Sequence, residues 1–319
     1  LYKIKLCFIL KELYCLATII FNLQNKIIMH TKLVNNKIGI LLMVTAIFSY
    51  SCMDGIIRYL SQYYNVITLG MFRYWFFALF IILIHSRDGK SLIEVSKSKV
   101  KFLQITRSII LTIELCCAHY CFYKIGLIQT SAIFAIGPLI VTALSVVILK
   151  EKVGWRRWSA ISIGFVGILI ILRPAFISFE PFSFMALGCA FLFAIYQILT
   201  RLVSKYDNND TTLLYTGIIG ALILTSVGPF FYSEVQTIDW LWILLISILG
   251  LIAHLCIINA LKISEASLLQ PFNYLHLVFV TIIGIFIFNE VLETPVIIGS
   301  LIVIIAGLYT FSREYIINK

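Results

Sequence analysis

Apolar stretches follow one another along most of the chain and are separated by short polar connections. A helix needs about 20 apolar residues to cross the hydrocarbon core of a bilayer. The stretches are continuous and rich in Leu, Ile and Phe, whereas strands of an outer-membrane barrel would alternate in polarity. We therefore predict an all-α polytopic membrane protein with about ten transmembrane helices. The predicted spans are 38–60, 66–86, 102–123, 127–149, 156–172, 181–203, 211–231, 240–261, 266–288 and 295–312.

Composition and charge agree with this pattern. Apolar residues make up 61% of the chain and charged residues 13%, and the mean hydropathy is +1.00. From Lys32 onward, 17 Lys and Arg residues fall on one side of the predicted spans and only Arg58, Lys124 and Arg173 on the other. Positive residues gather on the cytoplasmic side, so both termini are predicted to be cytoplasmic. The net charge of +10 then reports topology in the inner membrane, and we expect no nucleic-acid partner.

The first 35 residues read as an N-terminal extension. The chain begins with Leu1, and its first methionine is Met29, shortly before the first span. We predict that Met29 is the true start. The apolar stretch 6–21 is interrupted by Lys11 and Glu12 and has no small-residue cleavage site of the signal-peptide kind. The alternative is an amphipathic or additional membrane segment.

The cysteines and the catalytic motifs do not indicate an enzyme. Six of the eight cysteines lie inside predicted spans, where Cys behaves as a small apolar residue, and no metal-ligand spacing accompanies them. Gly-x-Ser-x-Gly, paired membrane aspartates, His-Glu-x-x-His and a nucleotide-binding loop are absent from the sequence. We predict no catalytic residue, metal or cofactor, and no direct use of ATP.

The chain repeats itself. Gly137-Pro138 is followed by Lys150-Glu151 at the end of the fourth span, and Pro271 is followed by Asn289-Glu290 at the end of the ninth, an offset of 139 residues. We predict a first repeat over 36–174, a second over 175–312 and a tail over 313–319. Because five spans separate the copies, the second is inverted. Inverted repeats are typical of alternating-access transporters, whose substrate site lies near the midplane between the repeats.

Several motifs carry a family resemblance over residues 36–312. They are Met53-Asp54-Gly55 with Arg58-Tyr59-Leu60-Ser61, Phe72-Arg73-Tyr74, Thr106-Arg107-Ser108, Gly137-Pro138-Leu139, Lys150-Glu151-Lys152-Val153-Gly154-Trp155-Arg156-Arg157-Trp158, Arg173-Pro174, Tyr196-Gln197-Ile198-Leu199-Thr200-Arg201, Ala266-Ser267-Leu268-Leu269, Pro271-Phe272 and Asn289-Glu290. In order and spacing the chain resembles the drug/metabolite transporter superfamily, in its ten-span group of two EamA-type domains. The resemblance implies a multi-pass inner-membrane carrier with a central cavity, a small-molecule substrate and alternating access. It also implies that membrane lipid surrounds the protein and that transport is coupled to a proton, another ion or a counter-substrate.

Polar residues inside the first three spans are the first site candidates, because a charge at the bilayer centre costs about 2.5–3.5 kcal/mol and usually marks function. Asp54 and Arg58 are four residues apart and are predicted to pair, either as a gate or substrate anchor or as a fixed structural pair. Arg73 is a candidate to hold a substrate carboxylate, with contact between helices as the alternative. Glu114 is a candidate to carry a coupling proton, unless it only bonds a neighbouring hydroxyl, and His119 lies on the same span.

The later spans supply the remaining candidates. Gly137, Pro138 and Pro271 are predicted helix breaks, since proline lacks the backbone donor and freed carbonyls are tolerated beside a cavity. Residues close to the break in the ninth span are predicted to line that cavity, and weaker candidates lie in spans six and eight, where ordinary packing is the alternative. For Glu151 and Glu290 we predict capping or loop pairing. The candidates are Gln270, Asn273, Tyr274 and His276 in span nine, Tyr196 and Gln197 in span six, and His254 and Asn259 in span eight.

The mixed charge of Asp54, Glu114 and Arg73 suits a zwitterion with a planar or apolar part. The heavy use of Ile, Lys, Asn and Tyr suggests an AT-rich genome of the kind found in obligate intracellular bacteria. The resembled superfamily includes S-adenosylmethionine carriers of such organisms. S-adenosylmethionine, or a related nucleoside or amino-acid metabolite, is thus the leading substrate hypothesis. Export of amino acids or drugs is the alternative, and a membrane enzyme or receptor is less favoured.

Overall fold

The protein is helical throughout its described part. The computed structural model describes residues 36–87, 91–150, 155–172 and 181–317, and no strand occurs among them. The N-terminal extension with Met29, and Glu151 after the fourth span, lie outside the described residues. The all-α fold class is confirmed for the residues that the structure describes.

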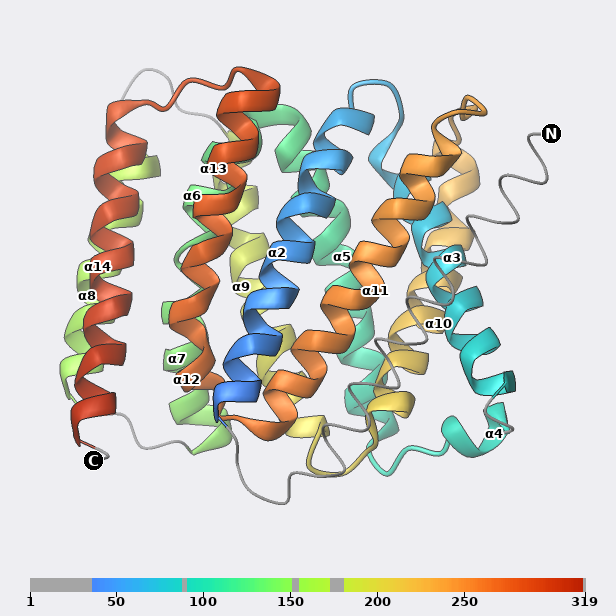
Figure 1. Ribbon diagram of the computed structural model, residues 1–319, viewed down its shortest axis with the longest axis horizontal. Helices are drawn as coiled ribbons and strands as arrows, with labels where there is room; N and C mark the ends of the chain where they lie inside the picture. The colour runs from blue at the N-terminus through green and yellow to red at the C-terminus, as the bar shows by residue number, and fades with distance from the viewer. Residues whose placement is uncertain (1–35, 88–90, 151–154, 173–180, 318–319) are drawn as a thin grey trace.

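Helices cover each of the ten predicted spans (Figure 1). The first half contains α2 (Asn36–Leu60), α3 (Val66–Arg87), α4 (Leu92–Val95), α5 (Lys101–Ile125), α6 (Leu127–Phe134), α7 (Gly137–Leu144), the π-helix η1 (Ser145–Leu149) and α8 (Trp155–Leu172). The second half contains α9 (Pro181–Val203), α10 (Asn209–Val227), the 3₁₀ turn η2 (Gly228–Phe231), α11 (Trp240–Ile263), α12 (Ala266–Leu269), the 3₁₀ turn η3 (Gln270–Asn273), α13 (Tyr274–Phe288) and α14 (Thr294–Ile317).

By length and composition, seven stretches of the described chain are able to cross a membrane. They are Lys37–Leu60, Val66–Leu83, Lys101–Ile125, Leu127–Leu149, Pro181–Val203, Asn209–Phe231 and Trp240–Ile263. Shorter apolar helices lie within α8, α13 and α14. A count of ten spans therefore stays a prediction. In Figure 1, α2 begins and α14 ends at the same edge of the bundle, as an even number of crossings requires.

The two halves interlock through equivalent helix pairs. Helix α2 packs against α11, and α5 packs against α9. In the second repeat, α9 corresponds to α2 and α11 corresponds to α5. The contact between α5 and α9 is therefore equivalent to the contact between α2 and α11. The remaining pairs, α3 with α10 and α8 with α14, each join counterparts directly. In Figure 1, α2 starts at the lower edge and α9 starts at the upper edge, which is the relation expected of an inverted repeat.

The predicted helix breaks are confirmed. Helix α6 ends at Phe134, and α7 begins at Gly137 with Pro138 in its first turn. Pro271 lies in the 3₁₀ turn η3 between α12 and α13. Proline supplies no backbone N–H for a continuous α-helix, so the chain ends one helix and begins another. Each break lies in the fourth of the five predicted spans of its own repeat.

The ends of the two broken helices are also equivalent. Lys150 after η1 and Asn289 after α13 are both left-handed, with φ of 58° and 52°. They are separated by the repeat offset of 139 residues. This backbone conformation is energetically unfavourable for a residue other than glycine. Its occurrence at equivalent positions shows that the repeat seen in the sequence is also present in the structure.

Helices α8 and α14 approach each other closely at Gly167 and Gly299. A Cβ atom on Gly167 would lie 2.8 Å from the carbonyl oxygen of Gly299, and one on Gly299 would lie 2.5 Å from the carbonyl oxygen of Gly167. Backbone atoms cannot rotate away as a side chain can. The absence of side chains at both positions therefore allows the two helices to touch, as small residues do in membrane helix pairs.

We expect Gly167→Ala to lower the stability of the protein by about 1–3 kcal/mol, because the added methyl group forces α8 and α14 apart. Thermal unfolding of the purified protein in detergent measures this effect. Gly188→Ala is the matched control, since a Cβ on that helical glycine meets no atom within 4 Å and Ala favours helix. Equal unfolding temperatures for the two variants would contradict the close approach.

Candidate functional site

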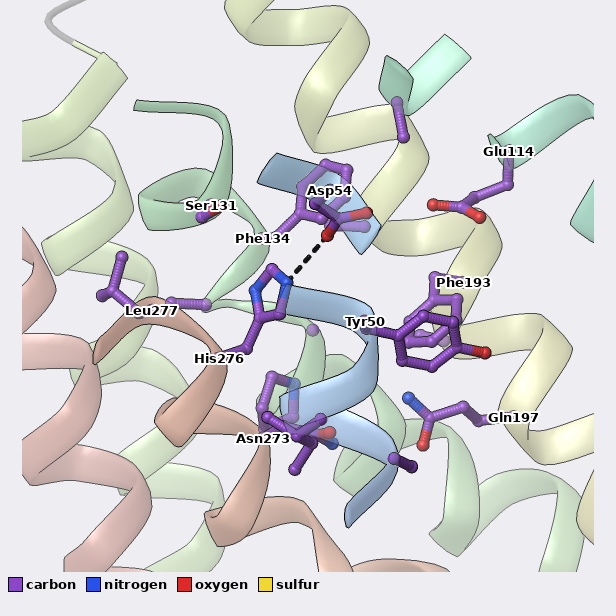
Figure 2. Close-up of a pocket in the computed structure, with 18 of the residues that line it drawn as sticks. Tyr50, Asp54, Glu114, Ser131, Phe134, Phe193, Gln197, Asn273, His276 and Leu277 are labelled. Atoms are coloured by element: carbon purple, nitrogen blue, oxygen red, sulfur yellow. Dashed lines mark hydrogen bonds and ion pairs between the residues drawn. The ribbon is translucent and has the colours of Figure 1, made fainter. Parts of the chain in front are cut away.

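A cavity lies between the two halves of the bundle (Figure 2). Its walls come from α2, α5, α6, α7, α9, α11 and α13 and from the turn η3, so both repeats contribute. Its volume is about 100 Å³, below the roughly 300–1,000 Å³ of typical small-molecule sites. The structure therefore represents a narrow state of the cavity, and a metabolite-sized ligand requires the helices to move apart.

The cavity contains most of the charged candidates. Asp54, Glu114, His119 and His276 line it, together with Gln197, Asn273, Gly137 and Pro138. Glu114 and His119 face the same cavity although they are five residues apart on α5. Glu114 lies about midway along this helix, which is the depth at which transporters of inverted-repeat architecture bind their substrates.

Asp54 pairs with a residue of the other repeat. Nε2 of His276 on α13 donates a hydrogen bond to Oδ2 of Asp54 on α2 at 2.9 Å (Figure 2). The predicted pair with Arg58 is wrong. Position 58 is one turn closer to the end of α2, where Nε of Arg58 lies 3.5 Å from Oε1 of Glu290. Each residue therefore has a partner in the second repeat, His276 on α13 or Glu290 shortly after the end of α13, and tertiary packing decided against the local pair.

Glu290 joins the two repeats. Its two carboxylate oxygens accept hydrogen bonds from the backbone N–H groups of Leu127 and Ile128, each at 2.8 Å. These are unpaired donors of the first turn of α6, where a carboxylate is favoured. Arg58 adds the ion pair and donates to the carbonyl of Tyr123 at 3.2 Å. Glu290 caps a helix, but the local cap that the sequence predicts is wrong, because the capped helix belongs to the other repeat.

A glycine makes room for this cap. Gly126 precedes α6 with φ of +84°, a conformation that other residues rarely adopt. A Cβ atom at this position would lie 3.0 Å from Oε1 of Glu290. The glycine thus fits the turn and also leaves space for the carboxylate.

Three buried polar atoms beside the cavity have no hydrogen-bond partner among the described residues. They are Oε2 of Glu114, Nε2 of His119 and Oγ of Ser131. Each residue is at most 3% exposed. Buried polar groups are nearly always paired, and an unpaired one calls for a missing partner such as water, an ion or a ligand. Because these three atoms belong to residues that line one cavity, the cavity is a candidate binding site.

The residues around the ninth-span break form a polar row. Nδ2 of Asn273 donates to Oε1 of Gln270 at 2.8 Å, and Nε2 of Gln270 donates to Oε1 of Gln197 at 3.2 Å. Asn273 and Gln197 face the cavity, whereas Gln270 lies behind them. Tyr274 is buried in an apolar cluster and does not line the cavity. The prediction of cavity-lining residues near Pro271 thus holds for Asn273 and fails for Gln270 and Tyr274, while His276 both lines the cavity and forms a hydrogen bond within the bundle.

Arg73 does not reach the cavity. Its guanidinium is buried, lies 5.2 Å from the ring centre of Tyr74 and contacts Sδ of Met53 at 3.5 Å. Met53 lines the cavity and separates Arg73 from it. The expectation that Arg73 adds its charge to the cavity wall is therefore wrong, because its side chain packs among α2, α3 and aromatic rings.

Of the weaker candidates in spans six and eight, Gln197 lines the cavity, whereas Tyr196, His254 and Asn259 do not. His254 lies between two tyrosines, with its Nδ1 3.0 Å from the hydroxyl of Tyr50 and 3.4 Å from that of Tyr196. Only Tyr50 of these three lines the cavity. Asn259 bonds with Asn209 and donates to the carbonyl of Leu255 at 2.8 Å. Packing is the better interpretation for Asn259.

Sequence reasoning missed several residues. The aromatic rings of Tyr50 and Phe193 meet edge to face, with centres 6.4 Å apart, and form one wall (Figure 2). Phe134 and Ser131 contribute from α6. Tyr50 lies one helical turn before Asp54, so the period of a helix could have indicated it. For Ser131, the only indication in the sequence that it lines the cavity was its closeness to the predicted break at Gly137 and Pro138.

Arg107 was counted with the loop charges, but it is fully buried. Its guanidinium donates to Oγ1 of Thr216 at 2.6 Å and to the carbonyl of Thr212 at 2.8 Å, and it lies 5.2 Å from the ring centre of Tyr196. The charge thus joins α5, α9 and α10. Its partners come from distant parts of the sequence, so the spacing of residues around Arg107 does not identify them.

Comparison with known proteins identifies the fold and its duplication. A model of the EamA-like transporter family matches residues 37–173 and again residues 181–312. The chain belongs to the EamA-like transporter family. The two matches coincide with the two halves described above, so each half is one copy of the family unit. Family membership and the apolar helices make it a multi-pass protein of the bacterial inner membrane.

Several transporters are similar to this chain. An S-adenosylmethionine uptake transporter of Rickettsia prowazekii is 24% identical over 278 residues, covering 86% of this chain and 93% of that protein. A riboflavin transporter of Vibrio cholerae is 29% identical but covers 58% of this chain and 62% of its own length. A solved crystal structure covers 88% of the chain with a TM-score of 0.67 and 14% identity, a likeness that shows the fold alone.

An exporter is also among the similar proteins. The pseudopaline exporter CntI of Pseudomonas aeruginosa is 22% identical over 272 residues, covering 85% of this chain and 94% of its own length. Proteins similar to this chain therefore include both an uptake system and an exporter. All of the named relatives are transporters rather than enzymes, and they imply a small-molecule substrate.

Proposed function

We propose that the protein is a secondary-active carrier that moves a small organic metabolite across the inner membrane by alternating access. The observation that carries this proposal is the cavity between the repeats, in which Glu114, His119 and Ser131 each present a buried polar atom without a partner among the described residues. Such atoms suit a ligand that supplies the missing hydrogen bonds. In this proposal the ten helices are ten spans and both termini are cytoplasmic.

The duplicated architecture supports alternating access. Each repeat contributes one broken helix to the cavity, and the equivalent helix pairs relate the two halves. Movement of one repeat against the other would open the cavity to each side in turn. Glu290 on the second repeat holds the first turn of α6 on the first, and in our proposal this contact closes one end of the cavity.

The leading substrate is S-adenosylmethionine or a related metabolite. Similar proteins carry that name in several Rickettsia species and span nearly the whole chain. The cavity combines carboxylates with the aromatic walls of Tyr50, Phe134 and Phe193, which suits a molecule with a charged part and a planar part. A proton gradient, another ion gradient, exchange or the membrane potential would drive any uphill movement.

Export is the second candidate, and the similarity to the pseudopaline exporter favours it. This exporter aligns with about as much of the chain as the S-adenosylmethionine uptake transporter does. The extent of the alignment therefore does not determine the direction of transport. The experiment that tests the proposal must therefore measure transport in both directions.

Purified protein in proteoliposomes tests the proposal. We expect saturable uptake of one member of a labelled panel that contains S-adenosylmethionine, several amino acids, riboflavin and a nucleoside. Runs with and without a pH gradient separate proton coupling from exchange, and preloaded vesicles test export. Uptake equal to that of protein-free vesicles for every compound, in both directions, would contradict the proposal.

A further inference from the structure

The cavity wall carries an excess of negative charge. Asp54 and Glu114 supply two carboxyl groups, and no Lys or Arg is among the described residues that line the cavity. The two histidines, His119 and His276, are its remaining ionisable groups apart from Tyr50. Because a carboxylate inside a membrane protein is costly unless it is paired, this wall favours a ligand with a positive charge.

In the structure, His276 is the partner that pairs with the Asp54 carboxylate. It donates to Oδ2 of Asp54 at 2.9 Å, and the two side chains are 19% and 10% exposed. The pair thus faces the cavity and is not sealed in the core. It also joins α2 of the first repeat to α13 of the second at the wall of the cavity (Figure 2).

We infer that Asp54 is the anchor for a positively charged group of the transported molecule, an ammonium or sulfonium, and that His276 occupies this anchor when the substrate is absent. The inference rests on the proposed function and names the recognition element of the same site. His276 then competes with the substrate for Asp54. Entry of the cation replaces a contact between the repeats by a contact with the ligand, which frees α13 from α2.

Glu114 strengthens the preference for a cation. Its Oε2 atom has no hydrogen-bond partner among the described residues and belongs to the same cavity. Tyr50, Phe134 and Phe193 add aromatic faces, which attract cations electrostatically. A neutral ligand of the same shape would gain neither interaction.

Binding of phenyltrimethylammonium to purified protein tests the anchor separately from transport. In titration calorimetry we expect Asp54→Asn to weaken binding at least about tenfold, which is 1.4 kcal/mol. His276→Gln should strengthen it about threefold or more, because the competitor for Asp54 is gone. Asp54→Glu should restore most of the lost affinity, and Ser49→Ala on the same helix should change nothing. Gel filtration and thermal unfolding check that each variant is folded.

S-adenosylmethionine and S-adenosylhomocysteine provide a matched pair for transport, since a sulfonium in one is a neutral thioether in the other. Asp54→Asn should reduce the preference for the sulfonium at least about fivefold, a change of about 1 kcal/mol. Folded protein that does not bind phenyltrimethylammonium would overturn the inference. So would equal binding by wild type and Asp54→Asn, or weaker binding by His276→Gln. Cation binding without transport of any compound would instead contradict the proposed function and leave the anchor supported.

Discussion

Glu114→Gln should reduce transport at least about tenfold, equivalent to 1.4 kcal/mol of lost transition-state stabilisation. The carboxyl group lies about midway along α5, is 3% exposed and has one oxygen without a partner among the described residues. A charge at this depth costs about 2.5–3.5 kcal/mol, and no hydrogen bond from the described residues to Oε2 offsets that cost. The side chain is therefore suited to a substrate or a coupling proton. Gln keeps the shape and removes both the charge and the exchangeable proton.

Initial rates of labelled uptake into proteoliposomes measure the effect. Lys97→Gln and Lys99→Gln are controls, because these exposed side chains lie outside the cavity and should leave the rate within about twofold. Uptake by Glu114→Gln at the wild-type rate, with and without a pH gradient, would remove Glu114 from the mechanism. A large loss in either lysine variant would indicate a site outside the cavity.

Glu290→Ala should release the first turn of α6. The substitution removes two charge-assisted hydrogen bonds to the N–H groups of Leu127 and Ile128 and the ion pair with Arg58. Hydrogen bonds to charged groups are worth about 1.5–3 kcal/mol each. We therefore expect amide hydrogen exchange of these two residues to become at least about tenfold faster. Mass spectrometry of peptides from the start of α6 reads this change directly.

The matched control is Glu234→Gln, which neutralises an exposed carboxylate in the connection between η2 and α11. It should leave exchange in α6 unchanged. We also expect Glu290→Ala to slow transport, because the contact that closes one end of the cavity is lost. Unchanged protection of α6 in Glu290→Ala would show that the cap contributes little to the closed arrangement.

The helices, their breaks and the repeat were predictable because they depend on local patterns. Apolar runs of bilayer length determine the spans, and Pro138 and Pro271 remove backbone donors wherever they occur. The presence of Asp54 and Glu114 in the cavity was also expected, because buried charges in a membrane protein rarely lack a role.

The pairings within the site were not predictable, because they join distant parts of the chain. Asp54 and Arg58 satisfy the rule for a local helix pair. Helix α13 lies beside α2, however, so Asp54 pairs with His276 on α13 and Arg58 pairs with Glu290 just after α13. From the sequence, Arg107 was grouped with the loop charges. In the structure its guanidinium is bound by Thr212 and Thr216. In each case the deciding contact comes from helix packing and not from spacing along the sequence.

Counterflow in proteoliposomes tests the central claim most directly. Vesicles are loaded with unlabelled S-adenosylmethionine, or with whichever panel compound is taken up, and placed in a trace of the labelled compound. A carrier that alternates between two faces should accumulate label transiently above its equilibrium level, and Asp54→Asn should lose this overshoot. Label that only equilibrates would contradict alternating access, and label that never enters would contradict a carrier for the panel compounds.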